Sequence, residues 1–177
     1  KLEQNAGKSE AVKKGILAAQ GDIVGFTDAD AATPIGELSK VLQNMASGYE
    51  VVIGSRARRS KDTVLKAKFH RRLMGRVFNA FLKGILQIRD AEGRTLKDTQ
   101  CGFKWFTREV AQNIFPKLLT KGFAFDVEVL FMAHQRKYRI LEMPVNWADR
   151  RDSRVSLLSD PLKMLWQIII IRFKHAN

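Results

Sequence analysis

The sequence predicts an α/β domain with a mainly parallel sheet flanked by helices. Short apolar runs bounded by Gly, Asp or Pro alternate with segments of helical spacing, and a strand, a helix and a second strand in this order make a parallel crossover. The run in residues 21–30 ends in Asp28 and Asp30, and the run in residues 51–54 leads to Arg56. Ligands bind beyond the carboxyl ends of such strands, so the sequence predicts a binding site at this edge.

The elements follow one another in order along the chain. Residues 7–20 have the spacing of an amphipathic helix, which Asn5 can cap. Thr33 and Pro34 are typical of a helix start, and this second helix is expected to run to about Ala46. Later strands are expected at residues 103–107 and 139–145, and later helices at residues 108–115 and from Asp160 onward.

Asp28 and Asp30 have the spacing of a metal clamp. Two carboxylates separated by one residue can point to the same side of an extended segment. They can then share one hard divalent cation, Mg²⁺ or Mn²⁺, which takes further oxygens from substrate phosphates. A solvated Asp-rich turn is the alternative that this motif alone leaves open.

The charge of the chain limits its partners. The formal net charge of +13 indicates an anionic partner, namely nucleic acid, an anionic membrane surface or a phosphorylated substrate. We expect no nucleic acid, because the aromatic residues fall at core spacing and no reading motif occurs. The single cysteine, Cys101, excludes an intrachain disulfide. No apolar run approaches the ~18 residues that a membrane span needs.

Two segments suit a membrane surface. Residues 60–86 are expected to form a basic amphipathic helix within a main domain of residues 1–155. Such a helix can lie on a lipid surface, or pack on the core with its basic face in solvent. Residues 156–177 are expected to form a C-terminal helix, for which an interfacial position with Trp166 at headgroup depth and a dimer contact both stay open. A homo-oligomer therefore stays open too.

Several weak motifs occur in one order, and together they are specific. They are Asn5-Ala6-Gly7-Lys8, Asp28-Ala29-Asp30, Gly54-Ser55-Arg56, Asp98-Thr99-Gln100-Cys101-Gly102-Phe103, Gly122 to Glu128, Glu142 to Val145 and Trp147 to Arg154. In this order they resemble the polyprenyl-phosphate glycosyltransferases of the GT-A fold, the dolichyl-phosphate mannose and glucose synthases and their prokaryotic relatives. The form of the Asp28-Ala29-Asp30 segment is slightly more similar to the glucose synthases.

The resemblance implies a reaction and its partners. A hexose would move from a nucleotide-sugar donor, UDP-glucose or GDP-mannose, to a polyprenyl or dolichyl phosphate with inversion. The enzyme would be a peripheral membrane protein at the cytoplasmic face. Two competing interpretations are a non-catalytic fragment that binds the membrane surface and, after it, a basic nucleic-acid-binding module.

The resemblance also implies site residues. Asp28 and Asp30 would hold Mg²⁺ or Mn²⁺, with Asp30 counted among the catalytic residues. Asp98, the other residue expected to be catalytic, would orient the acceptor or bind a sugar hydroxyl or the metal. Lys8 would neutralise donor phosphate at a helix N-terminus, although a plain capped helix explains it equally. The remaining residues expected to contact donor or acceptor phosphates are Arg56, Arg150, Ser153 and Arg154.

Two further expectations concern the start of the chain and the apolar run that contains Asp126 and Glu128. Members of the resembled family begin with a strand–helix–strand unit that holds the nucleotide base, and we find no such segment, so the N-terminal strands are expected to be missing. Asp126 and Glu128 lie in an apolar run, where a carboxylate needs a partner, an Arg or a substrate hydroxyl.

Overall fold

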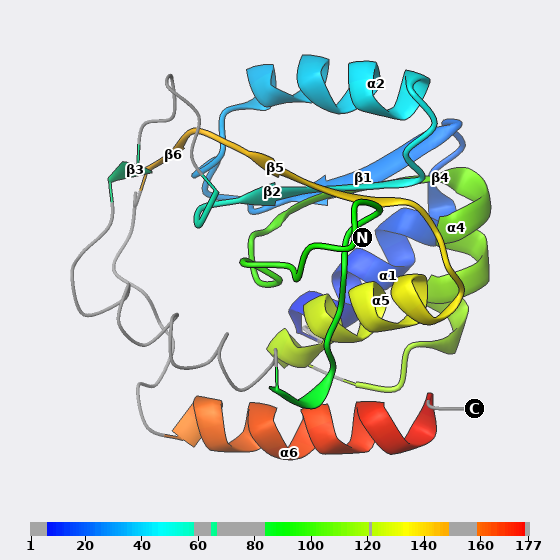
Figure 1. Cartoon of the computed structure of the whole chain (residues 1–177), viewed down its shortest axis with the longest axis vertical. Coiled ribbons are helices and arrows are strands. Elements are labelled where there is room, and N and C mark those ends of the chain that lie inside the picture. Colours follow the sequence, from blue (N-terminus) through cyan, green and yellow to red (C-terminus); the bar gives the residue numbers. More distant parts are fainter. Residues whose placement is uncertain (1–6, 59–64, 67–83, 121, 149–158, 176–177) are drawn as a thin grey trace.

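The computed structural model describes residues 7–58, 65–66, 84–120, 122–148 and 159–175. These residues form layers around one four-stranded sheet (Figure 1). Of the described helices, α2 (Leu38–Ala46) covers one face of the sheet. The opposite face is covered by α1 (Lys8–Ala18), α4 (Arg108–Ile114) and α5 (Phe125–Gln135). The C-terminal α6 (Ser159–Lys174) lies against α5, outside that layer.

The sheet has the strand order β1-β4-β2-β5. Its strands are β1 (Ile23–Thr27), β4 (Phe103–Thr107), β2 (Val51–Ser55) and β5 (Ile140–Pro144). β2 and β5 are parallel, whereas β4 is antiparallel to both of its neighbours. Three strands therefore run the same way, as the mainly parallel prediction requires, and β4 is inserted between β1 and β2 in the opposite direction.

The insertion of β4 depends on a glycine in β1. Gly25 lies opposite Trp105 in the antiparallel pair. A Cβ atom at position 25 would lie 2.4 Å from the Trp105 ring. The indole therefore lies across the backbone of β1 where only a glycine leaves room.

The starts of the helices agree with the prediction, except that a 3-10 turn precedes α2. Thr107 caps α4, since its hydroxyl accepts a hydrogen bond from the Val110 backbone at 3.4 Å. The segment after Pro34 begins as a 3-10 turn, Ile35–Glu37, before α2 runs to Ala46 as predicted. Other 3-10 turns are Phe115–Lys117 and Gly122–Ala124.

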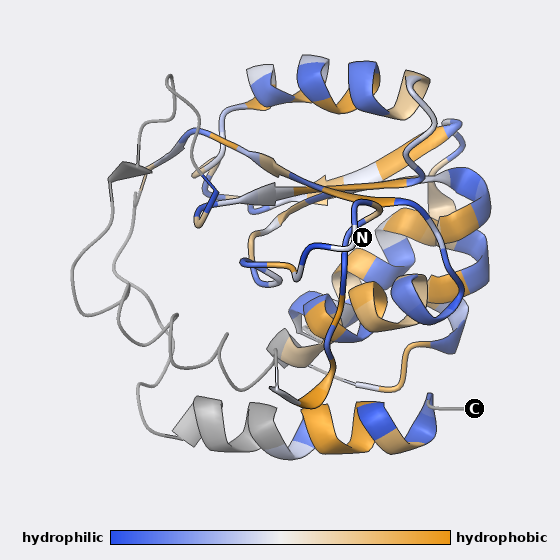
Figure 2. Cartoon of the chain, viewed as in Figure 1, coloured by the Kyte–Doolittle hydropathy of each residue, from blue (hydrophilic) through white to orange (hydrophobic). Residues whose placement is uncertain are grey.

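The core lies mainly between the sheet and the layer of α1, α4 and α5, where Figure 2 shows apolar residues gathered. α5 is its centre, because every residue from Phe125 to Ala133 is buried. A helix buried on all sides has no solvent face for its charged residues. Asp126 and Glu128 are therefore buried with it and must find partners inside the protein.

The two segments expected at a membrane have different outcomes. Residues 60–64 and 67–83 lie outside the described residues, so most of the predicted basic helix does too. Its described part includes β3 (Leu65–Lys66), which pairs in parallel with β6 (Trp147–Ala148), so the helix prediction is wrong at those two residues. Backbone pairing with β6 outweighs the helical spacing there. The helix after Asp160 is confirmed as α6.

Within the described ranges, no helix combines the length and the apolar character that crossing a bilayer requires.

Candidate functional site

The two carboxylates of the predicted clamp lie in a tight turn directly after β1. The backbone N–H of Asp28 donates to the Gly102 carbonyl at 2.8 Å, which ties the turn to the segment before β4. The Ala31 N–H donates to the Asp28 carbonyl at 3.0 Å, with Ala31 in the left-handed region at φ 51°. The Ala32 N–H donates to Asp30 Oδ1 at 3.0 Å. The turn thus fixes both residues at the carboxyl end of β1.

Gly102 makes the space that the Asp28 carboxylate occupies. A Cβ atom at position 102 would lie 2.1–2.2 Å from the carboxyl atoms of Asp28. Nothing but a hydrogen atom fits between them. The Asp98–Phe103 motif therefore requires a glycine at position 102 to make room for Asp28. Sequence reasoning missed this requirement because Asp28 is distant in the chain.

Lys8 reaches the clamp from the first residue of α1. Its Nζ lies 2.9 Å from Asp28 Oδ1 and 3.6 Å from Asp126 Oδ2. Burial works against the charged form of this amine, but the carboxylates of Asp126 and Asp28 outweigh it and raise the pKa of Lys8. Lys8 therefore stays positively charged between two carboxylates.

A second lysine completes this arrangement inside the protein. Lys104 is fully buried in β4 and donates to Asp126 Oδ1 at 2.5 Å and to the Cys101 carbonyl at 2.7 Å. Negative and positive side chains thus alternate from the sheet edge into the core, in the order Asp28, Lys8, Asp126 and Lys104. The partner predicted for Asp126 was an arginine or a substrate hydroxyl, and the structure gives two lysines instead. A lysine inside an apolar strand was the signal that could have identified Lys104.

Asp98 holds Arg56 at the same edge of the sheet. The Arg56 side chain donates to both carboxylate oxygens, from Nε at 2.7 Å and from Nη2 at 2.8 Å, and its backbone N–H donates at 2.9 Å. Burial alone would raise the pKa of Asp98, but Arg56 outweighs it and holds that pKa below its usual range. The Arg56 guanidinium also lies 5.6 Å from the ring centre of Trp147. Asp98 is fully buried, while about a third of the Arg56 side chain, 34%, is exposed.

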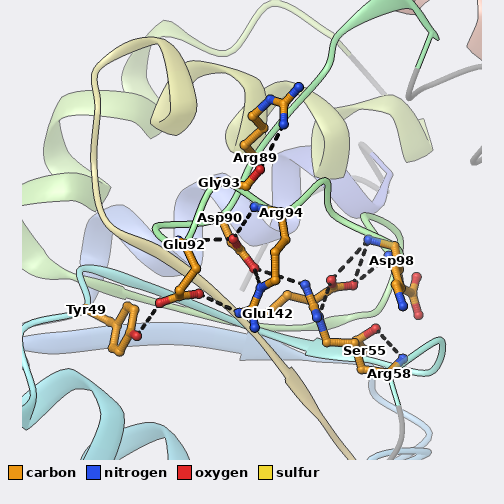
Figure 3. A network of polar contacts seen from close by, with 11 residues as sticks. Tyr49, Ser55, Arg58, Arg89, Asp90, Glu92, Gly93, Arg94, Asp98 and Glu142 are labelled. Carbon is orange, nitrogen blue, oxygen red and sulfur yellow. Dashed lines mark hydrogen bonds and ion pairs between the residues drawn. The ribbon is translucent and has the colours of Figure 1, made fainter.

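A buried network behind this pair fixes the loop that carries Asp98 (Figure 3). Glu142 of β5 accepts the backbone N–H groups of Lys97 at 3.0 Å and Asp98 at 2.8 Å. Arg58 donates to Glu142 at 2.6 Å and to Asp90 at 3.0 Å. The Glu142 motif in the sequence therefore acts on the site through the backbone of residue 98. Sequence reasoning did not assign this role.

Glu128, the second carboxylate expected to need a partner, lies away from this edge. Its oxygens accept the backbone N–H groups of Leu119 at 2.8 Å and Thr120 at 2.9 Å, and the Thr120 hydroxyl. The His175 ring, just after α6, contacts it at 2.7 Å. Glu128 therefore anchors α6 and a loop.

The structure thus brings Lys8 to Asp28, with Asp30 in the same turn, and pairs Arg56 with Asp98. Arg150, Ser153 and Arg154 lie outside the described residues. Cys101 is buried, and burial raises the pKa of its thiol to about 12, which leaves the thiol protonated and unreactive at neutral pH.

The carboxylate turn suits a magnesium or manganese ion. Across the described part of the chain, no cluster of three or more His, Cys, Asp and Glu side chains could hold a metal. Two carboxylates fit Mg²⁺, which is bound through one or two carboxylates with substrate phosphates as further ligands. The space left by Gly102 and the turn bond at Asp30 fix those carboxylates beforehand. The residues present therefore fit such an ion when a diphosphate accompanies it.

A mixed sheet with carboxylates after β1 and cations beside them is an arrangement for binding an anionic substrate. Residues 1–115 match the model of "Glycosyl transferase family 2". The chain therefore belongs to this family of glycosyltransferases, and its fold is GT-A.

Particular relatives are similar over nearly the whole chain. The dolichyl-phosphate beta-glucosyltransferase of Dictyostelium discoideum is 37% identical over 99% of this chain and 53% of the relative. The proteins of that name from Saccharomyces cerevisiae and Homo sapiens are 34% and 33% identical over 99% of this chain, each matched over 54% of its own length. The chain spans about half the length of these curated relatives.

Solved structures of glucosyl-3-phosphoglycerate synthase from Mycobacterium tuberculosis share the fold. The complex with UDP has a TM-score of 0.60 at 21% identity, over 96% of this chain and 55% of that one. The complex with Mn²⁺, UDP and phosphoglyceric acid has a TM-score of 0.61 at 18% identity, over 97% and 54%. At such identity the likeness shows the fold alone.

Proposed function

We propose that this chain carries the catalytic part of a glycosyltransferase that moves glucose from UDP-glucose to a dolichyl or polyprenyl phosphate with inversion. The observation that carries the proposal is the position of Asp28, Asp30 and Arg56 just beyond the carboxyl ends of β1 and β2, with Lys8 of α1 paired to Asp28. Relatives named dolichyl-phosphate beta-glucosyltransferases support glucose and the lipid phosphate. GDP-mannose is the donor to be tested against UDP-glucose.

Asp28 and Asp30 would hold Mg²⁺ or Mn²⁺ in this proposal. When bound, the ion supplies charge neutralisation for the diphosphate of the leaving nucleotide. The Mn²⁺ and UDP in the solved relative of the same fold support this assignment. Lys8 carries a further positive charge beside Asp28 and would serve the donor phosphates.

Arg56 would bind a phosphate of the donor or the acceptor. Within the described part of the chain, the Nε and Nη2 groups of Arg56 donate to Asp98, which leaves Nη1 of the five-donor guanidinium for a substrate. A phosphate monoester is already an anionic nucleophile at neutral pH, so the reaction needs no base to activate it. Asp98 is therefore a positioning residue that aims Arg56. Arg150, Ser153 and Arg154 remain proposed contacts of the acceptor phosphate.

We place the enzyme peripherally on the cytoplasmic face of a membrane, with α6 at the surface. Ile168 and Ile171 of α6 are buried against the domain. Trp166 is 65% exposed and Phe173 is 77% exposed. Exposed aromatic residues on a helix that ends in basic residues suit an anionic lipid surface. A second copy of the chain is the alternative occupant of this face.

The test is sugar transfer to a short polyprenyl phosphate with Mn²⁺, with UDP-glucose and GDP-mannose in parallel. It is run on this chain and on a chimera that adds the segments of the Dictyostelium relative that lie outside the match. We expect Asp30→Ala to lower transfer at least about a hundredfold, because the ion loses one of its two protein carboxylates. Asp22→Ala is the matched control, since the Asp22 side chain at the other end of β1 is fully exposed.

Transfer from UDP-glucose that Asp30→Ala abolishes and Asp22→Ala spares supports the proposal. If transfer occurs from GDP-mannose and not from UDP-glucose, the proposed donor is wrong and GDP-mannose takes its place. Vesicle binding without transfer in either protein overturns the catalytic proposal in favour of a membrane-binding fragment.

A further inference from the structure

Lys8 is bound by two carboxylates that differ in their remaining partners. Asp28 is partly exposed, and its Oδ1 accepts the Lys8 amine at 2.9 Å. Asp126 is buried, divides its oxygens between two lysines, and lies at 2.5 Å from Lys104 and 3.6 Å from Lys8. Lys8 is therefore nearer to the exposed carboxylate than to the buried one.

This pairing places Lys8 in competition with a metal ion. The Asp28 oxygen that Lys8 occupies belongs to the carboxylate that would ligate the ion. An ammonium and a divalent cation repel each other at such separations, so they do not share one oxygen. An ion that takes this oxygen displaces Lys8 from Asp28, and the flexible four-carbon stem of the lysine permits the movement.

Asp126 is the carboxylate on the other side of the Lys8 amine. A small swing of the side chain would close the 3.6 Å separation to a full ion pair. Lys104 is fixed by the Cys101 carbonyl and does not follow. Asp126 can thus receive Lys8 without a change in the fold.

We propose that Lys8 is a resident counter-cation of the metal site and that Asp126 is its second anchor. In the absence of a divalent cation Lys8 neutralises Asp28, and when the ion binds Asp28, Lys8 moves to Asp126. Asp126 is then a positioning residue for metal binding, although it does not touch the ion. This inference rests on the proposed metal site of Asp28 and Asp30.

The test measures Mn²⁺ binding to the chain in the presence of UDP, by the electron paramagnetic resonance signal of free Mn²⁺, with UDP alone as the reference. We expect Lys8→Met to tighten binding about three- to tenfold, because the competing cation is gone. We expect Asp126→Asn to weaken it by a similar factor, because Lys8 then stays on Asp28. Lys14→Met, at an exposed position of the same helix with a side chain that is 62% exposed, controls for net charge.

The double variant separates this mechanism from a general effect of charge. If Asp126 acts through Lys8, then Asp126→Asn has no effect in the Lys8→Met background. Additive effects of the two substitutions overturn the inference, because Asp126 would then act through its field alone. Binding that is unchanged or weaker in Lys8→Met overturns it too, and so does the absence of Mn²⁺ binding in both the unaltered chain and Lys8→Met.

Asp126→Asn removes the carboxylate partner of the buried Lys104, so its fold is checked by circular dichroism. If this variant does not fold, Lys8→Arg carries the test. The guanidinium fork holds a carboxylate with two hydrogen bonds, so we expect weaker Mn²⁺ binding, and unchanged or tighter binding overturns the inference. Asp30→Ala distinguishes a failure of the proposed metal site from a failure of the role proposed for Lys8 and Asp126. Mn²⁺ binding that does not depend on Asp30 removes the proposed metal site itself.

Discussion

The Asp28 carboxylate packs directly against the α-carbon of Gly102, so the clamp depends on a residue that carries no chemistry. We predict that Gly102→Ala displaces Asp28 and weakens Mn²⁺ binding at least about tenfold, as a fraction of an ångström matters in such sites. Gly15→Ala is the control, because nothing lies within 4 Å of the added methyl and the helix should gain about 0.5–1 kcal/mol. Titration with Mn²⁺ and thermal unfolding of both variants are the measurements, and normal Mn²⁺ binding by Gly102→Ala contradicts the packing reason.

Asp98 and Arg56 should link stability to pH. Because the pKa of Asp98 is lowered in the folded state, its stabilisation is present above the ordinary carboxyl pKa of about 4 and is lost as the pH falls through the lowered value. We predict that Asp98→Asn lowers the free energy of unfolding by about 2–3 kcal/mol at pH 7, and that the difference from the unaltered chain shrinks at pH 3.

Urea unfolding at the two pH values checks this prediction, with the fully exposed Asp22→Asn as the control. A destabilisation that is the same at pH 3 and pH 7 would mean that the Asp98 charge contributes nothing. Transfer activity should fall together with stability, because Arg56 loses the group that aims it.

At the scale of the element, α6 has two faces with separate tasks. Its inner face docks through Ile168 and Ile171, and His175 beyond its end contacts Glu128. We predict that the double substitution Trp166→Ser with Phe173→Ser on the outer face changes the free energy of unfolding by less than about 0.5 kcal/mol. The same variant should bind anionic vesicles several-fold more weakly, because two interfacial aromatic anchors are lost.

Vesicle co-sedimentation and urea unfolding measure these two quantities. Ile35→Ser, which removes an exposed apolar side chain (63% exposed) from another surface, is the control. If the double variant binds vesicles normally but is a monomer where the unaltered chain is a dimer, the outer face of α6 is a contact between copies.

At the scale of the whole molecule, the sheet order decides which residues meet. β4 enters the sheet between β1 and β2, where it pairs Lys104 with Phe26 and brings the preceding Gly102 against Asp28. The net charge of +13 is reflected at the site, because its carboxylates are paired with basic side chains. Lys8 pairs with Asp28, and Arg56 pairs with Asp98.

The sequence by itself determined the four strands of the main sheet, the position of Asp28 and Asp30 after β1, and the family, because these depend on local apolar spacing and on motifs in order. It could not determine the direction of β4, the strand at Leu65–Lys66 or the partners of Asp126. Only the tertiary structure decided these, because Lys8, Asp126 and Lys104 come from three separate elements. A buried charge is stable only when an opposite charge lies close to it in space. The spacing of residues along the chain does not show which distant residue that will be.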